Sequence, residues 1–360
     1  MTFTFCPKES RTYDFLHFAK MIYADFKKTI REEPELESVI DEDHEQLIEH
    51  IKKSLEPYRK TIEFYYLDDS FSKYDFVQLL IQAFPIEAHN EINDYVEHLS
   101  NQSAETIKHE LLRAILKEEQ EDEIADEAVE KALEQNEMEF VHGLDADPSF
   151  KWSLLVILED PKRHLDRFVD LLLEIYPVFR EIYDSYVDDV LSIGKRLEDA
   201  LNSNPEEAIR RLTMGRIDHA IIKGREARLY VSAIFAYMLR VRDVGNVPIF
   251  IWGRRMEAAF ERISRLNEDR IDHRVKLFKA LGDRTRYEVL RSISRGASSL
   301  KDIAHSLGVS SATISYHTNE FIKAGAIRLD KGQRKLGYRI DYDLLESVIE
   351  EFKKDLSFPE

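Results

Sequence analysis

The sequence is poor in the features that mark secreted and membrane proteins. Cys6 is the only cysteine in 360 residues, so a disulfide framework and a site built from several thiolates are both excluded. No apolar run approaches the length of a membrane span, and the first residues have neither the basic start nor the apolar core of a signal peptide. We therefore expect a cytoplasmic protein that is neither secreted nor inserted in a membrane.

Signatures of catalysis are also missing. The sequence has no Gly-rich phosphate loop, nucleophile elbow or paired-carboxylate signature. The segment 44–50 resembles a zinc-hydrolase motif, but His44 and His50 are six residues apart, and ligation from one helical face needs three or four. We predict no catalytic residues, no metal site and no cofactor, and hence a protein that is not an enzyme.

Positive charge is scarce overall but concentrated near the C-terminus. The chain has 51 Lys and Arg against 69 Asp and Glu, a net charge of −18, which by itself argues against binding the DNA backbone. Residues 271–345, however, contain 14 Lys and Arg against 8 Asp and Glu, which makes this segment +6 and the remainder −24. The asymmetry indicates a basic DNA-contacting module attached to an acidic body.

The hydrophobic pattern predicts a largely helical N-terminal part. A chain of 360 residues with 43% hydrophobic side chains favours more than one domain. Over roughly the first 200 residues, apolar side chains recur every three or four positions, as in helices. The clearest candidates are 13–28, 43–55, 74–84, 91–99 and 104–117. The segment 165–190 contains Pro177, which favours a kinked helix or two consecutive helices.

Two further segments of this body carry their own patterns. From 228 to 253, two runs rich in aromatic and β-branched residues flank Gly245-Asn246 and predict a small antiparallel strand pair. The segment 118–139 is strongly acidic, which favours a solvated helix face over a surface for a basic partner. Aromatic residues of the body could line an effector pocket, although core packing is the favoured interpretation; they are Phe64, Tyr65, Tyr66, Phe150 and Trp152.

A helix start signal opens the basic module. Asp283 is placed to cap the free N–H groups of a helix that begins there. We expect this helix to bury Tyr287, Leu290 and Ile293 and to end at Gly296.

The next unit, 299–321, has a helix-turn-helix pattern. Ala304 is small where two helices must cross closely, Gly308 permits a left-handed turn, and Ser310 can cap the second helix. An inward apolar face is supplied by Leu307, Val309, Ile314 and Phe321.

The second helix, 310–324, is predicted to read the major groove. The N-terminal turns of such helices face base edges, so we predict contacts from Ser310, Ser311, Ala312, Thr313, Ser315, Tyr316, His317 and Asn319. Tyr316 faces outward clearly. His317 lies beside Ile314 and Phe321 and points partly inward, so a structural role is favoured over a DNA contact, which stays open.

A wing is predicted at 328–340, where two strand-like segments flank a turn. Lys331, Arg334 and Lys335 at its tip are expected to contact phosphate or the minor groove, which adds salt-sensitive affinity with little sequence preference.

These motifs resemble the ArsR-type winged-helix family. The match lies in Leu281-Gly282-Asp283-Arg284-Thr285-Arg286 and Thr313-Ile314-Ser315-Tyr316-His317, in the right order with the wing behind them. It covers about a fifth of the chain. The resemblance implies a homodimeric, usually repressing regulator with a two-fold operator, its dimer contacts coming from helices outside the recognition unit.

The sequence departs from this family at its metal sites. Where founding members carry sensor cysteines, this chain has Lys301, Asp302 and His305 and no thiol. A second family site uses histidine with carboxylates on the last helix, whereas the carboxylates here stand without histidine: Asp341, Asp343, Glu346 and Glu350. Thr318 also replaces the usual leucine of the recognition helix. Metal sensing is therefore not expected.

The predicted fold class is mainly α with a small β component. We divide the chain into a helical regulatory and dimerisation body at 1–253, a connecting helix at 254–270, a winged helix-turn-helix at 271–345 and a C-terminal helix and tail at 346–360. The predicted function is a sequence-specific, homodimeric repressor that binds a double-stranded DNA operator and answers to an unknown small-molecule or protein effector. Two alternatives stay open: a regulator whose body is the primary functional site, and an enzyme that uses the winged helix as a scaffold.

Overall fold

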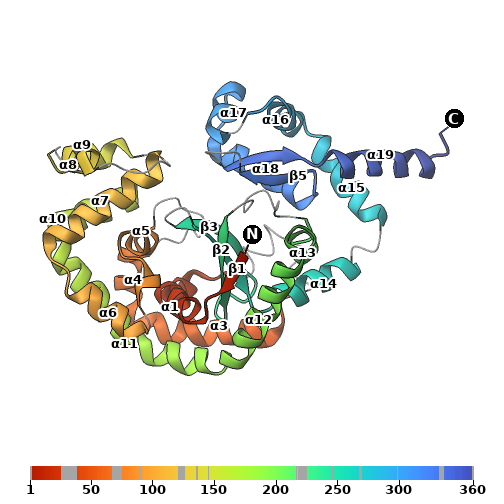
Figure 1. The fold of residues 1–360 in the computed structure, drawn as a ribbon. Coiled ribbons are helices and arrows are strands. Elements are labelled where there is room, and N and C mark those ends of the chain that lie inside the picture. Colours follow the sequence, from red (N-terminus) through yellow and green to blue (C-terminus); the bar gives the residue numbers. More distant parts are fainter. Residues whose placement is uncertain are drawn as a thin grey trace. The chain divides into compact units, whose positions relative to one another are not determined.

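The structure of the protein is a computed structural model. It describes residues 2–25, 39–66, 75–89, 91–120, 126–134, 137–144, 146–215, 217, 225–244, 247–266, 270–297, 299–331 and 336–358. Over these ranges the chain is mainly helical with a four-stranded and a two-stranded sheet (Figure 1). The predicted fold class is confirmed.

The chain forms two compact units. Unit 1 consists of Met1–Phe3, Leu197–Ala227 and Glu257–Glu360, and unit 2 of Thr4–Arg196 and Arg228–Met256. This division assigns 197–227 to the unit that contains the C-terminal residues, whereas the sequence assigns it to the body. The predicted domain boundaries after 253, 270 and 345 stay predictions.

Unit 2 is built mostly from helices (Figure 1). In chain order they are α1 (Pro7–His17), the 3-10 helix η1 (Phe18–Tyr23), α3 (Glu42–Leu55), η3 (Glu56–Tyr58), α4 (Arg59–Tyr65), α5 (Phe76–Ala83), η4 (Ile86–Ala88), α6 (Ile92–Ser100), α7 (Ala104–Gln120), α8 (Asp126–Glu134), α9 (Glu137–Gly143), α10 (Pro148–Glu159), α11 (Pro161–Asp184) and the first part of α12 (Val187–Ser203), whose residues from Leu197 on belong to unit 1. The helices predicted at 43–55, 74–84, 91–99 and 104–117 are confirmed to within a few residues. The helix predicted at 13–28 has other bounds: α1 runs from Pro7 to His17 and the 3-10 helix η1 from Phe18 to Tyr23, Ala24 and Asp25 are not helical, and 26–28 lie outside the described ranges.

Pro177 lies inside a continuous helix. α11 runs through it from Pro161 to Asp184, and α12 begins at Val187. The apolar side of α11 is fully buried at Phe168 and Phe179, on both sides of the proline. Packing of this side therefore holds the helix together although Pro177 cannot donate a backbone hydrogen bond.

The larger sheet contains four strands in the order β1-β2-β4-β3, and they are β1 (Thr2–Phe5), β2 (Glu226–Ser232), β3 (Leu239–Val244) and β4 (Val247–Gly253). β3 and β4 are antiparallel, as predicted, but β2 runs parallel to β4, so the prediction of a simple strand pair is incomplete. β4 is a central strand, and its run from Ile249 to Trp252 is buried throughout, which is typical of a strand covered on both faces.

The residues between β2 and β3 form a turn. The sequence assigns 234–239 to a strand-like run, but only Leu239 belongs to β3. A Cβ added at Gly253 would lie 2.3 Å from the carbonyl oxygen of Ala236, so this turn packs directly on the end of β4. The tight packing explains why an apolar run adopts a compact turn.

Polar side chains of α1 and η1 connect this helix to its neighbours. The Ser10 hydroxyl accepts a hydrogen bond from the Val231 backbone N–H (3.0 Å), and the ammonium group of Lys20 lies 2.7 Å from the carboxylate of Asp75, which is 1% exposed. Asp14 is fully buried between them. The helical pattern of the sequence gives no sign of this buried polar row.

His44 and several aromatic residues that the sequence singles out belong to the core of unit 2. His44 is 4% exposed and lies edge-on to the Tyr237 ring at 5.0 Å, and burial lowers its pKa to about 4. Tyr65, Tyr66 and Phe150 are buried, as predicted. Trp152 is 68% exposed, so the core interpretation is wrong for this residue.

Unit 1 contains the C-terminal helices and the smaller sheet. Its elements are α13 (Pro205–Leu212), α14 (Met256–Leu266), α15 (Arg270–Leu281), α16 (Arg284–Ser294), α17 (Leu300–Leu307), α18 (Ser311–Lys323), β5 (Ile327–Lys331), β6 (Leu336–Ile340) and α19 (Tyr342–Asp355). α14 lies within the predicted connecting helix. α15 to α19 share one apolar core, in which Val289, Ile314 and Phe321 are fully buried.

None of the helices described combines the length and apolar character that a membrane crossing requires. Within the described ranges, no three or more His, Cys, Asp and Glu side chains group closely enough to hold a metal ion.

Candidate nucleic-acid interface

α16 begins and ends where its sequence signals predict. The Asp283 carboxylate accepts a hydrogen bond from the Arg286 backbone N–H at 2.8 Å, and this bond lowers the pKa of Asp283 below its usual value. The helix ends at Ser294, and Gly296 has a φ of +87°, which glycine adopts without a steric penalty. Both predicted helix limits are confirmed.

One prediction for this helix is wrong. Tyr287 is 52% exposed, whereas Val289, Leu290 and Ile293 are buried. At about 100° per residue, Tyr287 lies roughly a third of a turn from the centre of the buried set. Its spacing from Leu290 fits a helical stripe, but Val289 shifts the buried face away from it.

The turn between α17 and α18 has the predicted geometry. Gly308 has a φ of +67° and ends α17, and the Val309 N–H donates to the Ala304 carbonyl at 3.1 Å. Ala304 is 4% exposed. A small residue at the crossing and a left-handed glycine at the turn together produce the helix-turn-helix geometry.

α18 is capped and anchored by its own residues. The Ser310 hydroxyl accepts a hydrogen bond from the Thr313 backbone N–H at 3.0 Å, which confirms the predicted cap. Ile314 and Phe321 are fully buried, as predicted. Thr318 is also fully buried, and its hydroxyl donates to the Ile314 carbonyl at 2.8 Å. The hydroxyl therefore has its hydrogen-bond partner within the helix, so burying Thr318 in place of a leucine costs little.

The opposite side of α18 is exposed. Tyr316 is 60% exposed, Ser311, Ala312 and Asn319 are also exposed, and Thr313, Ser315 and His317 are partly buried. Ala312, Ser315, Tyr316 and Asn319 lie on one face, because they are spaced by three and four residues. The structure thus presents most of the predicted groove-reading set on one accessible surface, and its contact with DNA stays a prediction.

His317 occupies the border between the two sides. Its Nδ1 is buried without a hydrogen-bond partner among the described residues, and its ring lies 5.5 Å from that of Tyr316. The Asp283 carboxylate is close enough to interact electrostatically with it. The partly inward position agrees with the sequence, and its role stays undecided between structure and DNA contact.

β5 and β6 form the predicted wing. They pair antiparallel from Ile327↔Ile340 to Lys331↔Leu336. Lys331 is the last residue of β5, and Arg334 and Lys335 lie outside the described residues. Backbone contact by these three cations stays a prediction.

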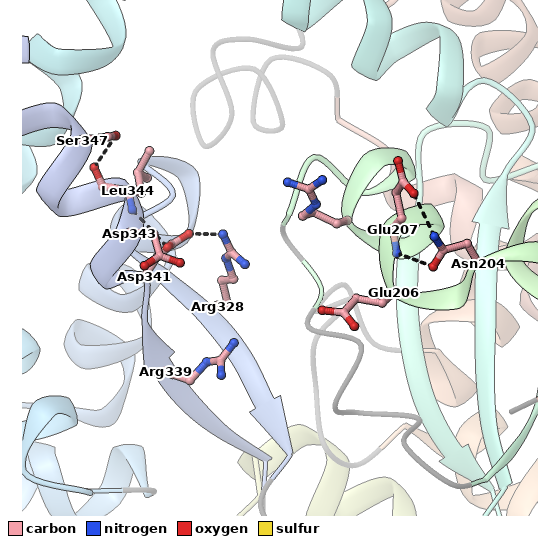
Figure 2. Close-up of a pocket in the computed structure, with 10 residues that line it drawn as sticks. Asn204, Glu206, Glu207, Arg328, Arg339, Asp341, Asp343, Leu344 and Ser347 are labelled. Carbon is pink, nitrogen blue, oxygen red and sulfur yellow. Dashed lines mark hydrogen bonds and ion pairs between the residues drawn. The ribbon is translucent and has the colours of Figure 1, made fainter.

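A pair of arginines on the wing was missed from the sequence. Arg328 and Arg339 are direct partners across the two strands, and like charges in such positions repel. Arg328 is compensated by an ion pair with Asp341, which Figure 2 shows at the base of the wing. Asp341 also accepts a hydrogen bond from the Leu344 N–H at 3.2 Å and so caps α19.

Arg339 is exposed on the neighbouring strand (Figure 2). It alternates along β6 with Tyr338 and Ile340, which pack on the apolar core. This alternation is the signal by which an outward cation at 339 could have been identified from the sequence.

Comparison with known proteins agrees with this geometry. Residues 282–328 match the family model described as winged helix-turn-helix DNA-binding. No curated protein and no solved structure matches the chain. The chain thus carries a winged helix-turn-helix DNA-binding domain, which indicates a DNA-binding regulator rather than an enzyme. The more specific ArsR-type resemblance goes beyond what this match supports.

Proposed function

We propose that the protein is a homodimeric transcription repressor of the ArsR type. α18 inserts its exposed face into the major groove, and the wing contacts the phosphate backbone next to it. The observation that carries the proposal is the exposed surface of α18, with Tyr316 at 60% exposure, on a helix whose other side is fixed in the core by Ile314 and Phe321.

The chemistry of this surface suits base edges. Ser311, Ser315 and Asn319 supply hydroxyl and amide groups that both donate and accept hydrogen bonds, and Ala312 is small enough for close approach. A tyrosine in the core would lie buried, whereas Tyr316 is free to stack on or hydrogen-bond to DNA. The helix therefore provides sequence readout, and the wing provides salt-sensitive affinity.

Dimerisation is supported by α15 and α19. The Arg274 guanidinium binds the carboxylates of Glu351 and Asp355, both at 2.6 Å, and so joins the two helices. Both helices also expose large apolar side chains at helical spacing: Ile271, Val275 and Phe278 on α15, and Tyr342 and Ile349 on α19, with Leu356 directly after its end. A second copy would bury this surface, since exposed apolar patches of this kind mark interfaces. The two winged helix-turn-helix modules of the dimer then bind half-sites that lie about one turn of the DNA duplex, or a multiple of one turn, apart.

The first test is a salt titration with DNA. A preferred duplex is selected from a random pool with the full chain, and its affinity is measured at several salt concentrations. Replacing Lys331, Arg334 and Lys335 together with Gln should weaken all duplexes alike and lower the slope of log K against log salt by up to about 0.9 for each phosphate that the variant no longer neutralises. Tyr316→Ala should change the selected sequence, because it removes a side chain that lies in the groove.

Matched controls separate these effects from net charge. Lys52, Lys53 and Lys60 belong to α3 and α4 of unit 2, and their joint replacement with Gln should leave the salt slope unchanged. Unchanged binding in both the wing variant and Tyr316→Ala would remove the assignment of this interface.

The dimer and repression are tested separately. Sedimentation equilibrium should give a dimer for the full chain and a monomer for Ile349→Asp, with Leu173→Asp, at an exposed leucine of α11, as the control that stays dimeric. Transcription in vitro from a promoter that carries the selected site should fall when the dimer is added. A rise in transcription would replace repression by activation and leave the DNA interface intact.

A further inference from the structure

α10 is apolar on two sides. Phe150, Leu154, Ile157 and Leu158 are buried, and α10 packs against α9 and α11. Its other side carries Trp152, Leu155 and Val156 at the spacing of one helical face, with Trp152 68% exposed and the other two partly exposed. Trp152 has the largest exposed fraction of any large hydrophobic side chain that the structure describes. A helix that is apolar all round normally lies fully inside a protein, so this face lacks the cover that its composition calls for.

Exposed carboxylates lie at both ends of the helix that carries Trp152, Leu155 and Val156. Asp147 caps the N-terminus of α10 and is exposed, and Glu159 and Asp160 are exposed at its C-terminus. Hydrogen bonds from the Ser149 side chain and backbone lower the pKa of Asp147 below its usual value. Lys151, the cation of α10, donates its Nζ to the His142 carbonyl of α9 at 2.9 Å and so is directed to that helix. The face thus has an apolar centre of a little over one turn, from Trp152 to Val156, between two negative ends of the helix.

We propose that this face of α10 is a docking surface for an amphipathic basic helix of another protein. Apolar residues of the partner, spaced by three and four, would cover Trp152, Leu155 and Val156, and Lys or Arg at its two ends would meet Asp147 and Glu159. Figure 1 shows α10 beside α9 (Glu137–Gly143), which adds the exposed carboxylate of Glu139. Long-range attraction to a basic segment therefore acts in the same direction as the local charges.

A second copy of this chain fits the face poorly. A two-fold pairing of α10 with itself in the antiparallel sense would bring Asp147 of one copy beside Glu159 of the other, and a parallel pairing would bring like residues together. Both arrangements bury carboxylates next to carboxylates, which costs free energy without a compensating cation. The charge pattern selects a cationic partner.

The test uses a labelled synthetic helix as the probe. A fluorescein-labelled Leu/Lys peptide of about five turns, with leucines on one face and lysines at both ends, is titrated with the full chain and followed by anisotropy. We expect saturable binding that Trp152→Ala weakens at least about tenfold, because a central aromatic residue carries much of the affinity of such interfaces. Glu159→Lys should also weaken binding, and this loss should shrink as salt is raised.

The controls locate the binding on α10. Leu173→Ala, on an exposed leucine of α11 in the same unit, should bind as the wild type does. A Leu/Glu peptide with the same apolar face should not bind. Circular dichroism checks that Trp152→Ala keeps its helix content, and this is expected because the side chain is mostly exposed.

Three results would overturn the proposal. One is equal affinity of the wild type and Trp152→Ala for the Leu/Lys peptide, and the second is an absence of saturable binding. The third is self-association of the full chain that Trp152→Ala abolishes, which would make the occupant a second copy. DNA binding by unit 1 is measured independently, so failure here leaves the proposed repressor function untouched.

Discussion

Asp14 makes a specific pH dependence of stability measurable. Its carboxylate is fully buried and accepts hydrogen bonds from the Ser232 hydroxyl (2.5 Å) and from the backbone N–H groups of Ala233 (2.7 Å) and Ile234 (3.2 Å). Among the described residues it has no salt-bridge partner. Burial raises the pKa of Asp14 to about 7, and the three donors offset only part of this effect.

The sign and size of the effect follow from linkage. In the unfolded chain an aspartate has a pKa of about 3.9, so between about pH 4 and pH 7 the folded state holds a proton that the unfolded state has lost. This contribution to stability is complete below about pH 4 and is lost as pH rises through about 7. A difference of roughly three pH units corresponds to an order of 4 kcal/mol.

Asp14→Asn should remove this dependence. The amide oxygen can accept from Ala233 and Ile234 as the carboxylate does, and the amide nitrogen can donate to the Ser232 hydroxyl oxygen. Asparagine thus imitates the neutral acid at every pH. We expect the stability of the wild type relative to Asp14→Asn to fall by roughly 3 kcal/mol between pH 5 and pH 8.

The assay is urea unfolding of the full chain at several pH values. The chain has two tryptophans, so a Trp152→Phe background lets the buried Trp252 of β4 report on unit 2 alone. Other titrating groups are common to both proteins and cancel in the difference. If the curves of unfolding free energy against pH run parallel for the wild type and Asp14→Asn, then Asp14 has the same pKa in the folded and the unfolded chain. That result would refute the reasoning.

Three other substitutions test single interactions. Ser310→Ala should cost about 1 kcal/mol of stability in chemical unfolding, because it removes the hydrogen bond to the Thr313 N–H, and retention of full stability would show that the cap contributes nothing. Gly308→Ala should also cost about 1 kcal/mol or a little more from its φ of +67°, since an added Cβ meets nothing within 4 Å; a much larger loss would indicate a clash that the geometry does not show. Gly253→Ala should be far more damaging, because its Cβ would lie 2.3 Å from the Ala236 carbonyl oxygen, and a thermal melt within a few degrees of the wild type would contradict this packing.

The winged module could be predicted from the sequence almost completely. Asp283, Gly308 and Ser310 act through bonds to residues no more than a few positions away, so their types reveal the limits of α16, α17 and α18 directly. Tyr287 was misplaced because a stripe drawn through Tyr287, Leu290 and Ile293 ignores Val289, and only the packing of neighbouring elements determines which of these side chains is buried.

The larger sheet could be predicted only in part. The hairpin of β3 and β4 joins neighbouring segments, and Gly245-Asn246 signals its turn. The parallel pairing of β2 with β4, and the place of β1 at the other end of the sheet, join residues that are not neighbours in sequence. No local pattern specifies such pairs.

The sequence alone determined that a basic winged helix-turn-helix follows an acidic helical body, because capping residues, turn glycines, apolar periodicity and charge are read residue by residue along the chain. The tertiary structure decided which side chains of that body are buried or exposed against the usual preference of their residue type. Asp14 is buried with no cationic partner among the described residues, and Trp152 is exposed on an apolar helix, since burial depends on what distant segments bring to a side chain and not on the residue itself.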